Sequence, residues 1–133
     1  MCDLKVLLVD DEKDFVEALA ERLQLRGINA QTATDGASAL RLIDTSPPQV
    51  VVLDVMMPGL GGADVLQRIK ATHPQIPVIL LSGHGSIHEE SLQIKENAFD
   101  YLVKPIDINE LLQKIQEALK VNKNRQVRLG DGP

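Results

Sequence analysis

Residues 4–11 read Leu-Lys-Val-Leu-Leu-Val-Asp-Asp, and residues 50–54 read Val-Val-Val-Leu-Asp. Both segments are short apolar runs that end in acidic residues. Runs of this length are typical of strands that are buried on both faces of a parallel sheet. Three further short segments complete the set of predicted strands. The strands are therefore expected at Leu4–Val9, Ile28–Thr32, Val50–Leu53, Ile76–Leu81 and Asp100–Val103.

The segments between these runs carry apolar residues three and four positions apart, which indicates amphipathic helices. These helices are expected at Asp14–Arg26, Gly36–Asp44, Ala63–Thr72, Ser86–Glu96 and Asp107–Val121. In the first, Phe15, Ala18, Leu19 and Leu23 are expected to form the buried stripe, with Asp14 as the N-cap and Gly27 as a left-handed cap. Strands and helices that alternate predict a doubly wound (βα)5 α/β fold, whose five-stranded parallel sheet has the order 2-1-3-4-5.

The composition fits one globular domain. The chain has 133 residues, of which 44% are hydrophobic and 25% charged. Residues 1–121 are expected to form the domain, and residues 122–133, which lack an apolar period, a flexible tail or linker. The net charge of −5 argues against direct binding of nucleic acid. The sequence shows neither a signal peptide nor a long apolar run, and Cys2 is its only cysteine, so we expect a cytoplasmic protein without membrane contact.

Three acids follow two of the predicted strands. Asp10 and Asp11 come directly after the first strand, and Asp54 comes after the third. In the strand order 2-1-3-4-5 these strands are neighbours, so the three carboxylates are expected to converge. Each close pair of like charges costs up to about 4 kcal/mol at an effective dielectric constant of about 20. A hard divalent cation held by oxygen ligands, such as magnesium, manganese or calcium, would remove this repulsion.

Two other polar residues end predicted strands. Ser82 follows the fourth strand and Lys104 follows the fifth. A metal, an ammonium and a hydroxyl around Asp54 would suit the transfer of a phosphoryl group onto this carboxylate. Asp54 is therefore the predicted nucleophile.

Each of these residues also has a purely structural interpretation. In that interpretation Asp11 is only a helix cap, Lys104 only a solvated lysine, and Ser82 only a turn residue. Their joint occurrence at four strand ends favours a functional site.

Four motifs in this order resemble the receiver domains of two-component response regulators, and the resemblance covers about residues 4–121. The motifs are Val9-Asp10-Asp11-Glu12, Leu53-Asp54-Val55-Met56-Met57-Pro58-Gly59, Ser82-Gly83 and Tyr101-Leu102-Val103-Lys104-Pro105.

The resemblance implies a flavodoxin-like fold and a role for each motif. Asp54 would accept a phosphoryl group from a sensor histidine kinase or phosphotransfer protein. Asp11, Asp54 and the backbone carbonyl of Met56 would ligate Mg²⁺, for which Mn²⁺ could substitute, and Asp10 would belong to the metal site mainly through a metal-bound water. Ser82 and Lys104 would bind the phosphoryl group. Ser82 and Tyr101 would form the switch, unless Tyr101 is only a half-buried strand residue. Pro105 would follow a cis peptide bond.

The resemblance also implies what the domain does. Phosphorylation would change its binding surface for a downstream effector protein or domain. The domain would catalyse only its own phosphorylation and dephosphorylation.

Two other functions fit parts of the pattern. A haloacid dehalogenase-type phosphohydrolase also phosphorylates a strand-end aspartate, but it needs a general acid where Met56 stands. A flavodoxin-type flavin carrier shares the topology, but Asp10 and Asp11 would repel the phosphate of the flavin.

Overall fold

The computed structural model of the chain describes residues 4–55, 62–82 and 98–131. Its centre is a five-stranded sheet with the order β2-β1-β3-β4-β5, in which all neighbouring strands are parallel. The strands are β1 Lys5–Val9, β2 Asn29–Ala33, β3 Val50–Asp54, β4 Val78–Ser82 and β5 Asp100–Val103. The predicted fold class and strand order are confirmed.

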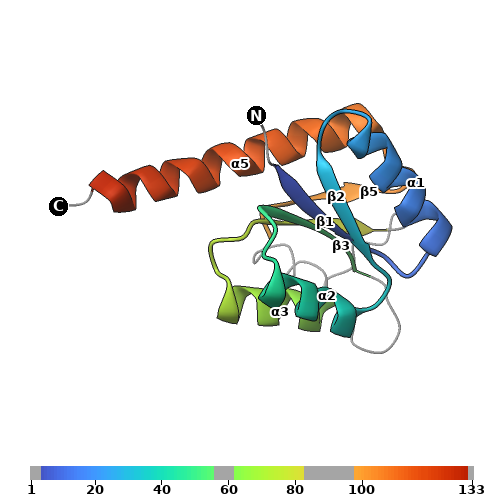
Figure 1. The fold of residues 1–133 in the computed structure, drawn as a ribbon, viewed down its shortest axis with the longest axis horizontal. Coiled ribbons are helices and arrows are strands. Elements are labelled where there is room, and N and C mark those ends of the chain that lie inside the picture. Colours follow the sequence, from blue (N-terminus) through green and yellow to red (C-terminus); the bar gives the residue numbers. More distant parts are fainter. Residues whose placement is uncertain (1–3, 56–61, 83–97, 132–133) are drawn as a thin grey trace.

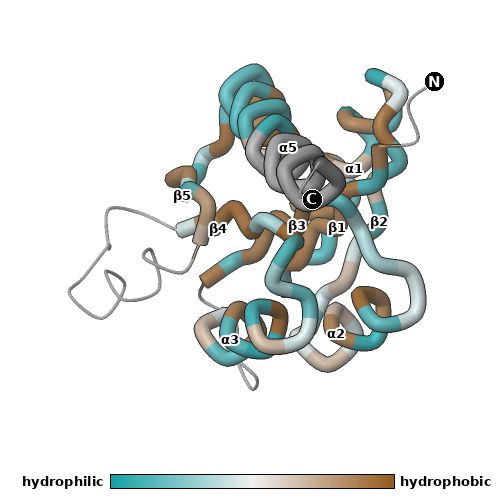
Figure 2. Tube along the Cα trace, turned by 90° about the vertical axis from the view of Figure 1, so that its left-hand side faces the viewer, coloured by the Kyte–Doolittle hydropathy of each residue, from teal (hydrophilic) through white to brown (hydrophobic). Residues whose placement is uncertain are grey.

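Helices cover both faces of this sheet (Figures 1 and 2). They are α1 Lys13–Gln24, α2 Gly36–Thr45, α3 Gly62–Thr72 and α5 Ile108–Asp131. Figure 2 shows α1 and α5 on one side of the strands and α2 and α3 on the other. The helix predicted at Ser86–Glu96 lies outside the described residues. Within the described part of the chain, no helix is both long and apolar enough to cross a membrane.

The core has two parts, one on each face of the sheet. Side chains of β1, β3 and β4 alternate between them: Leu8 and Val52 face α1 and α5, whereas Leu7 and Leu53 face α2 and α3. Every residue of β3 and β4 is buried. Such burial explains why these strands are continuous apolar runs, because a strand covered on both faces has no solvent side on which to place polar residues.

The beginning of α1 differs from the prediction. Glu12 is its N-cap, and the predicted cap, Asp14, lies in its first turn. The buried stripe is also shifted, because Val16 and Ala20 are buried whereas Ala18 is exposed. After the helix, Gly27 adopts a φ of 83°, the left-handed conformation that was predicted.

The last helix is longer than expected. Asp107 caps α5, since its side chain accepts a hydrogen bond from the backbone amide of Asn109 at 2.9 Å. The helix continues to Asp131, beyond the predicted end at Val121. Residues 122–129 contain neither glycine nor proline and include lysine, arginine and glutamine, which favour helices. Figure 1 shows this end of α5 pointing away from the sheet. The division into a domain and a tail stays a prediction.

Candidate metal and phosphoryl site

The carboxyl ends of β1 and β3 bring the predicted acids together. These strands are paired in parallel, with Val9 opposite Leu53. Asp10 directly follows β1, and Asp54 is the last residue of β3. Carboxylate oxygens of Asp10, Asp11 and Asp54 all lie within 4.8 Å of one another. The convergence predicted from the strand order is present in the structure.

The three acids differ in burial. Asp10 is 0% and Asp54 is 3% exposed, whereas Asp11 is exposed to solvent. Buried carboxylates need a nearby cation or hydrogen-bond donors, because burial favours their uncharged form. The donor set consists of oxygen atoms, which suit a hard divalent cation. These three residues are therefore able to hold a metal ion, with Asp11 on the solvent side.

Lys104 supplies a cation from the carboxyl end of the outermost strand, β5. It follows β5, and its backbone amide donates a hydrogen bond to the carbonyl of Ser82 at 2.8 Å. Its Nζ atom lies 2.7 Å from Asp10 Oδ2 and 3.8 Å from Asp54 Oδ2. The peptide bond between Lys104 and Pro105 is cis, as the resemblance implied.

The surroundings of Lys104 favour its charged form. Burial by itself lowers the pKa of Lys104, but hydrogen bonds to Asp10 and Glu12 and the charge of Asp54 outweigh this effect and raise the pKa well above its usual range. The ammonium therefore stays charged at neutral pH and offsets part of the repulsion among the acids.

Ser82 lies at the same edge of the sheet. It ends β4, which pairs with β3 so that Asp54 is opposite Leu81. The residue is 7% exposed, and its hydroxyl oxygen has no hydrogen-bond partner among the described residues. A buried hydroxyl group without a hydrogen-bond partner raises the free energy of the folded state. It is therefore suited to bind a polar group that joins the site.

Tyr101 and Met56 are the remaining residues predicted to belong to the site. Tyr101 is half-buried on β5 and packs against the core cluster that faces α2 and α3. Its backbone amide donates a hydrogen bond to Asp100 Oδ1 at 2.8 Å. Met56 lies outside the described residues, so its carbonyl remains a predicted metal ligand.

Three residues at the site were not predicted from the sequence to take part in it. Glu12 forms an ion pair with Lys104 at 2.8 Å, and the centroid of the Phe15 ring lies 4.7 Å from the same ammonium. A Cβ atom at Gly62 would lie 2.6 Å from the carbonyl oxygen of Asp54. Glu12 was visible as the third acid after β1. The contacts of Phe15 and Gly62 had no comparable sequence signal.

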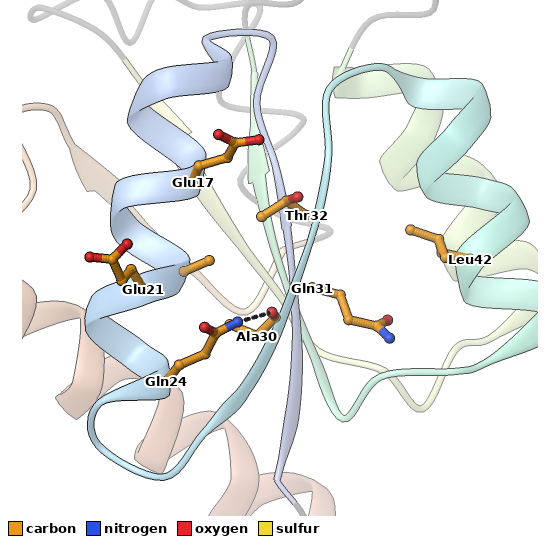
Figure 3. A pocket seen from close by; sticks show the side chains of 8 residues that line it. Glu17, Glu21, Gln24, Ala30, Gln31, Thr32 and Leu42 are labelled. Atoms are coloured by element: carbon orange, nitrogen blue, oxygen red, sulfur yellow. Dashed lines mark hydrogen bonds between the residues drawn. The ribbon is translucent and has the colours of Figure 1, made fainter.

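A groove beside the outermost strand β2 is separate from this site. It has a volume of about 470 Å³ and lies between α1, β2 and α2. Figure 3 shows Glu17 and Glu21 on one side of it, with Gln24 Nε2 donating a hydrogen bond of 3.1 Å to the carbonyl of Ala30. None of the residues that line it belongs to the acidic cluster. The groove is therefore not the metal site.

The parallel sheet and its acidic edge define a doubly wound α/β domain with a candidate metal site. Residues 6–116 match the family of the response regulator receiver domain. The chain therefore belongs to this family. Membership favours the receiver interpretation over the phosphohydrolase and the flavin carrier.

Similar proteins include full-length regulators and isolated domains. The chain is 41% identical to the transcriptional regulatory protein CpxR of Klebsiella pneumoniae over 116 residues, which are 87% of this chain and 49% of CpxR. It is 37% identical to a putative NtrX-like response regulator of Rickettsia typhi over 125 residues, which are 92% of this chain and 26% of that protein. The chain thus spans half or less of the length of these relatives.

Solved structures agree with this assignment. A response regulator receiver domain protein from Clostridium thermocellum superposes with a TM-score of 0.83 at 34% identity. The match covers 90% of this chain and 97% of that one. The receiver domain of NtrX from Brucella abortus gives a TM-score of 0.80 at 37% identity, over 86% of this chain and 98% of the other. Both nearly complete matches are single receiver domains.

Proposed function

We propose that this domain is a phosphoacceptor switch of a two-component system and that Asp54 accepts the phosphoryl group. One observation carries the proposal. The buried Asp54 carboxylate lies among the acids of a candidate metal site, with the Lys104 ammonium at 3.8 Å. The donor would be the phosphohistidine of a sensor histidine kinase or of a phosphotransfer protein.

The transfer forms one bond and breaks another. A carboxylate oxygen of Asp54 attacks the phosphorus atom, the phosphorus–nitrogen bond of the donor breaks, and the imidazole nitrogen keeps the electron pair. The Lys104 ammonium opposes the negative charge that the phosphoryl group brings to Asp54. The Ser82 hydroxyl donates a hydrogen bond to a phosphoryl oxygen and thereby gains the partner that it lacks among the described residues.

The acidic residues fit a resident Mg²⁺ ion, for which Mn²⁺ could substitute. Asp10, Asp11, Asp54 and the backbone carbonyl of Met56 would hold it. When bound, the ion supplies positive charge that neutralises the phosphoryl oxygens and the carboxylates. Asp10 and Asp54 are fixed at strand ends for this task, whereas the exposed Asp11 can adjust to the ion.

Phosphorylation would act on partners through the switch residues. Ser82 would move toward the phosphoryl group, and Tyr101 on the neighbouring strand would respond, so that a downstream effector protein or domain meets a changed surface. The pairing of β4 with β5 joins Ser82 and Tyr101 in one sheet. Apart from its own phosphorylation and dephosphorylation, the domain would catalyse no reaction.

Intact-mass measurement after incubation with acetyl phosphate tests the proposal. With Mg²⁺ the wild type should gain one phosphoryl group, and without a divalent cation it should gain none. Asp54→Asn should stay unmodified. Asp64→Asn, which changes an exposed acid in the first turn of α3, should be phosphorylated like the wild type. An equal adduct on Asp54→Asn would overturn the assignment.

Metal binding is measured separately by electron paramagnetic resonance of added Mn²⁺. Asp11→Asn should lose Mn²⁺ more completely than Asp10→Asn. The same affinity in both variants and in the wild type would contradict the proposed ligands.

A further inference from the structure

Glu12 contacts the same ammonium as the two buried carboxylates. Lys104 Nζ lies 2.7 Å from Asp10, 2.8 Å from Glu12 and 3.8 Å from Asp54. The first two distances are those of charge-assisted hydrogen bonds, and the third is longer. In this structure the ammonium is therefore held mainly by Asp10 and Glu12.

The backbone of Glu12 aims its side chain at Lys104. Glu12 is the N-cap of α1, but its side chain makes none of the hydrogen bonds by which an N-cap residue serves the first turn. Its backbone amide donates to Asp10 Oδ1 at 2.9 Å, which anchors it beside the site. The carboxylate therefore makes no capping hydrogen bond with the first turn of α1 and instead accepts a hydrogen bond from Lys104, which lies 92 residues further along the chain.

The two close partners of Lys104 differ in their access to water. The side chain of Asp10 is 0% exposed, whereas that of Glu12 is 63% exposed. When an ion pair breaks, a solvated carboxylate regains water, but a buried one is left without compensation. Glu12 is therefore the partner that can release Lys104 at low cost.

We propose that Glu12 is a positioning residue that holds the Lys104 ammonium away from Asp54 until a phosphoryl group arrives there. This inference rests on the proposed phosphorylation of Asp54. The phosphoryl group adds charge and acceptor oxygens on the Asp54 side, Lys104 leaves Glu12 for these oxygens, and the Glu12 carboxylate returns to water. Phe15, whose ring centroid lies 4.7 Å from Nζ, borders the ammonium during this exchange.

The first test observes Lys104 without any phosphorylation. Nuclear magnetic resonance of the lysine ammonium groups reports how fast their protons exchange with water. In Glu12→Gln and Glu12→Asp the Lys104 signal should exchange about two- to fivefold faster, the range that corresponds to the loss of one partly exposed ion pair. Lys114, which is paired with Asp100 at 2.7 Å, serves as the internal reference and should not change.

The second test measures the binding of beryllofluoride, a mimic of the phosphoryl group, in the presence of Mg²⁺ by fluorine resonance. Glu12→Gln and Glu12→Asp should both bind about two- to fivefold more tightly than the wild type, because Lys104 has lost its competing partner. Glu12→Asp is decisive, since it keeps the negative charge but has a shorter side chain. Asp14→Asn removes an exposed charge in the first turn of α1 and should bind like the wild type.

The outcomes separate this inference from the proposed function. If Glu12→Asp binds beryllofluoride like the wild type while Glu12→Gln binds more tightly, only charge matters and the inference is overturned. Unchanged exchange of the Lys104 ammonium in both Glu12 variants overturns it as well, even when beryllofluoride binds normally. If the wild type does not bind beryllofluoride at all, the proposed function fails, and the release of Lys104 fails with it.

Discussion

A Cβ atom added to Gly62 would lie 2.6 Å from the carbonyl oxygen of Asp54 and 2.7 Å from the Cα atom of Val55. These are backbone atoms, which cannot move aside as a flexible side chain can. Gly62, the first residue of α3, therefore packs directly against the backbone at Asp54, the candidate phosphoacceptor. Space, and not an unusual dihedral angle, requires glycine here.

Gly62→Ala should therefore disturb both stability and the site. Overpacking of this kind lowers the free energy of unfolding by about 1–3 kcal/mol, which urea unfolding can measure. The displaced backbone at Asp54 should also slow phosphorylation by acetyl phosphate. Gly27→Ala is the control, because Gly27 has a φ of 83° and no atom within 4 Å of an added Cβ. It should lower stability through backbone strain and leave the phosphorylation rate unchanged. Equal slowing in both variants would show that the Gly62 contact is not the cause.

The strand ends were the part of the site that sequence could predict. Parallel strands place their carboxyl ends at one edge, so the positions of Asp10, Asp54, Ser82 and Lys104 followed from the apolar runs before them. The roles of these residues are a different matter, because position alone does not show which atom carries a phosphoryl group. They remain proposals.

Contacts across the fold could not be predicted in this way. The reach of Glu12 to Lys104 spans 92 residues and depends on how α1 begins. The helical period also placed Ala18 in the core, although the structure buries Ala20 instead. The helical repeat of apolar residues locates the buried face of a helix only to within one residue. Alanine contributes little to this pattern, and packing decides which side of the helix faces the sheet.

The cap of α2 predicts a dependence of stability on acid. Asp35 accepts hydrogen bonds from the backbone amide of Ser38 at 2.7 Å and from its hydroxyl at 3.0 Å. These two bonds lower the pKa of Asp35, and the bond from the backbone amide has the larger effect. A lowered folded-state pKa gives stability that is present above the unfolded value, near 3.9, and lost as pH falls through the folded value. Asp35→Ala should thus be less stable than the wild type at pH 7.

Urea unfolding of both proteins from pH 7 downward checks this expectation. The difference between the wild type and Asp35→Ala should shrink below about pH 4, where the carboxyl group of the unfolded chain takes up its proton. A difference that stays constant to the lowest pH at which the proteins fold would contradict a charged cap.

Lys104 predicts the opposite dependence at alkaline pH. Despite its burial, the pKa of Lys104 is raised by Asp10, Glu12 and Asp54. A raised pKa gives stability that is fully present below the unfolded lysine value, about 10.4, and is lost as pH rises through the folded value. Above the unfolded lysine value, the free energy of unfolding should therefore fall more steeply with pH in the wild type than in Lys104→Met. Parallel losses in urea unfolding from pH 9 to 11 would contradict the ion pairs.

Ser82 allows stability and function to be separated. Its buried hydroxyl has no hydrogen-bond partner among the described residues, so Ser82→Ala removes an unfavourable burial. The variant should unfold with a free energy equal to that of the wild type or up to about 1 kcal/mol higher. Ser46→Ala is the matched control, because Ser46 accepts a hydrogen bond from Lys5 Nζ and its loss should lower stability.

If Ser82 binds the phosphoryl group, Ser82→Ala should nevertheless bind beryllofluoride more weakly, whereas Ser46→Ala should bind it normally. A Ser82→Ala variant that is clearly destabilised but binds beryllofluoride like the wild type would assign Ser82 a purely structural role.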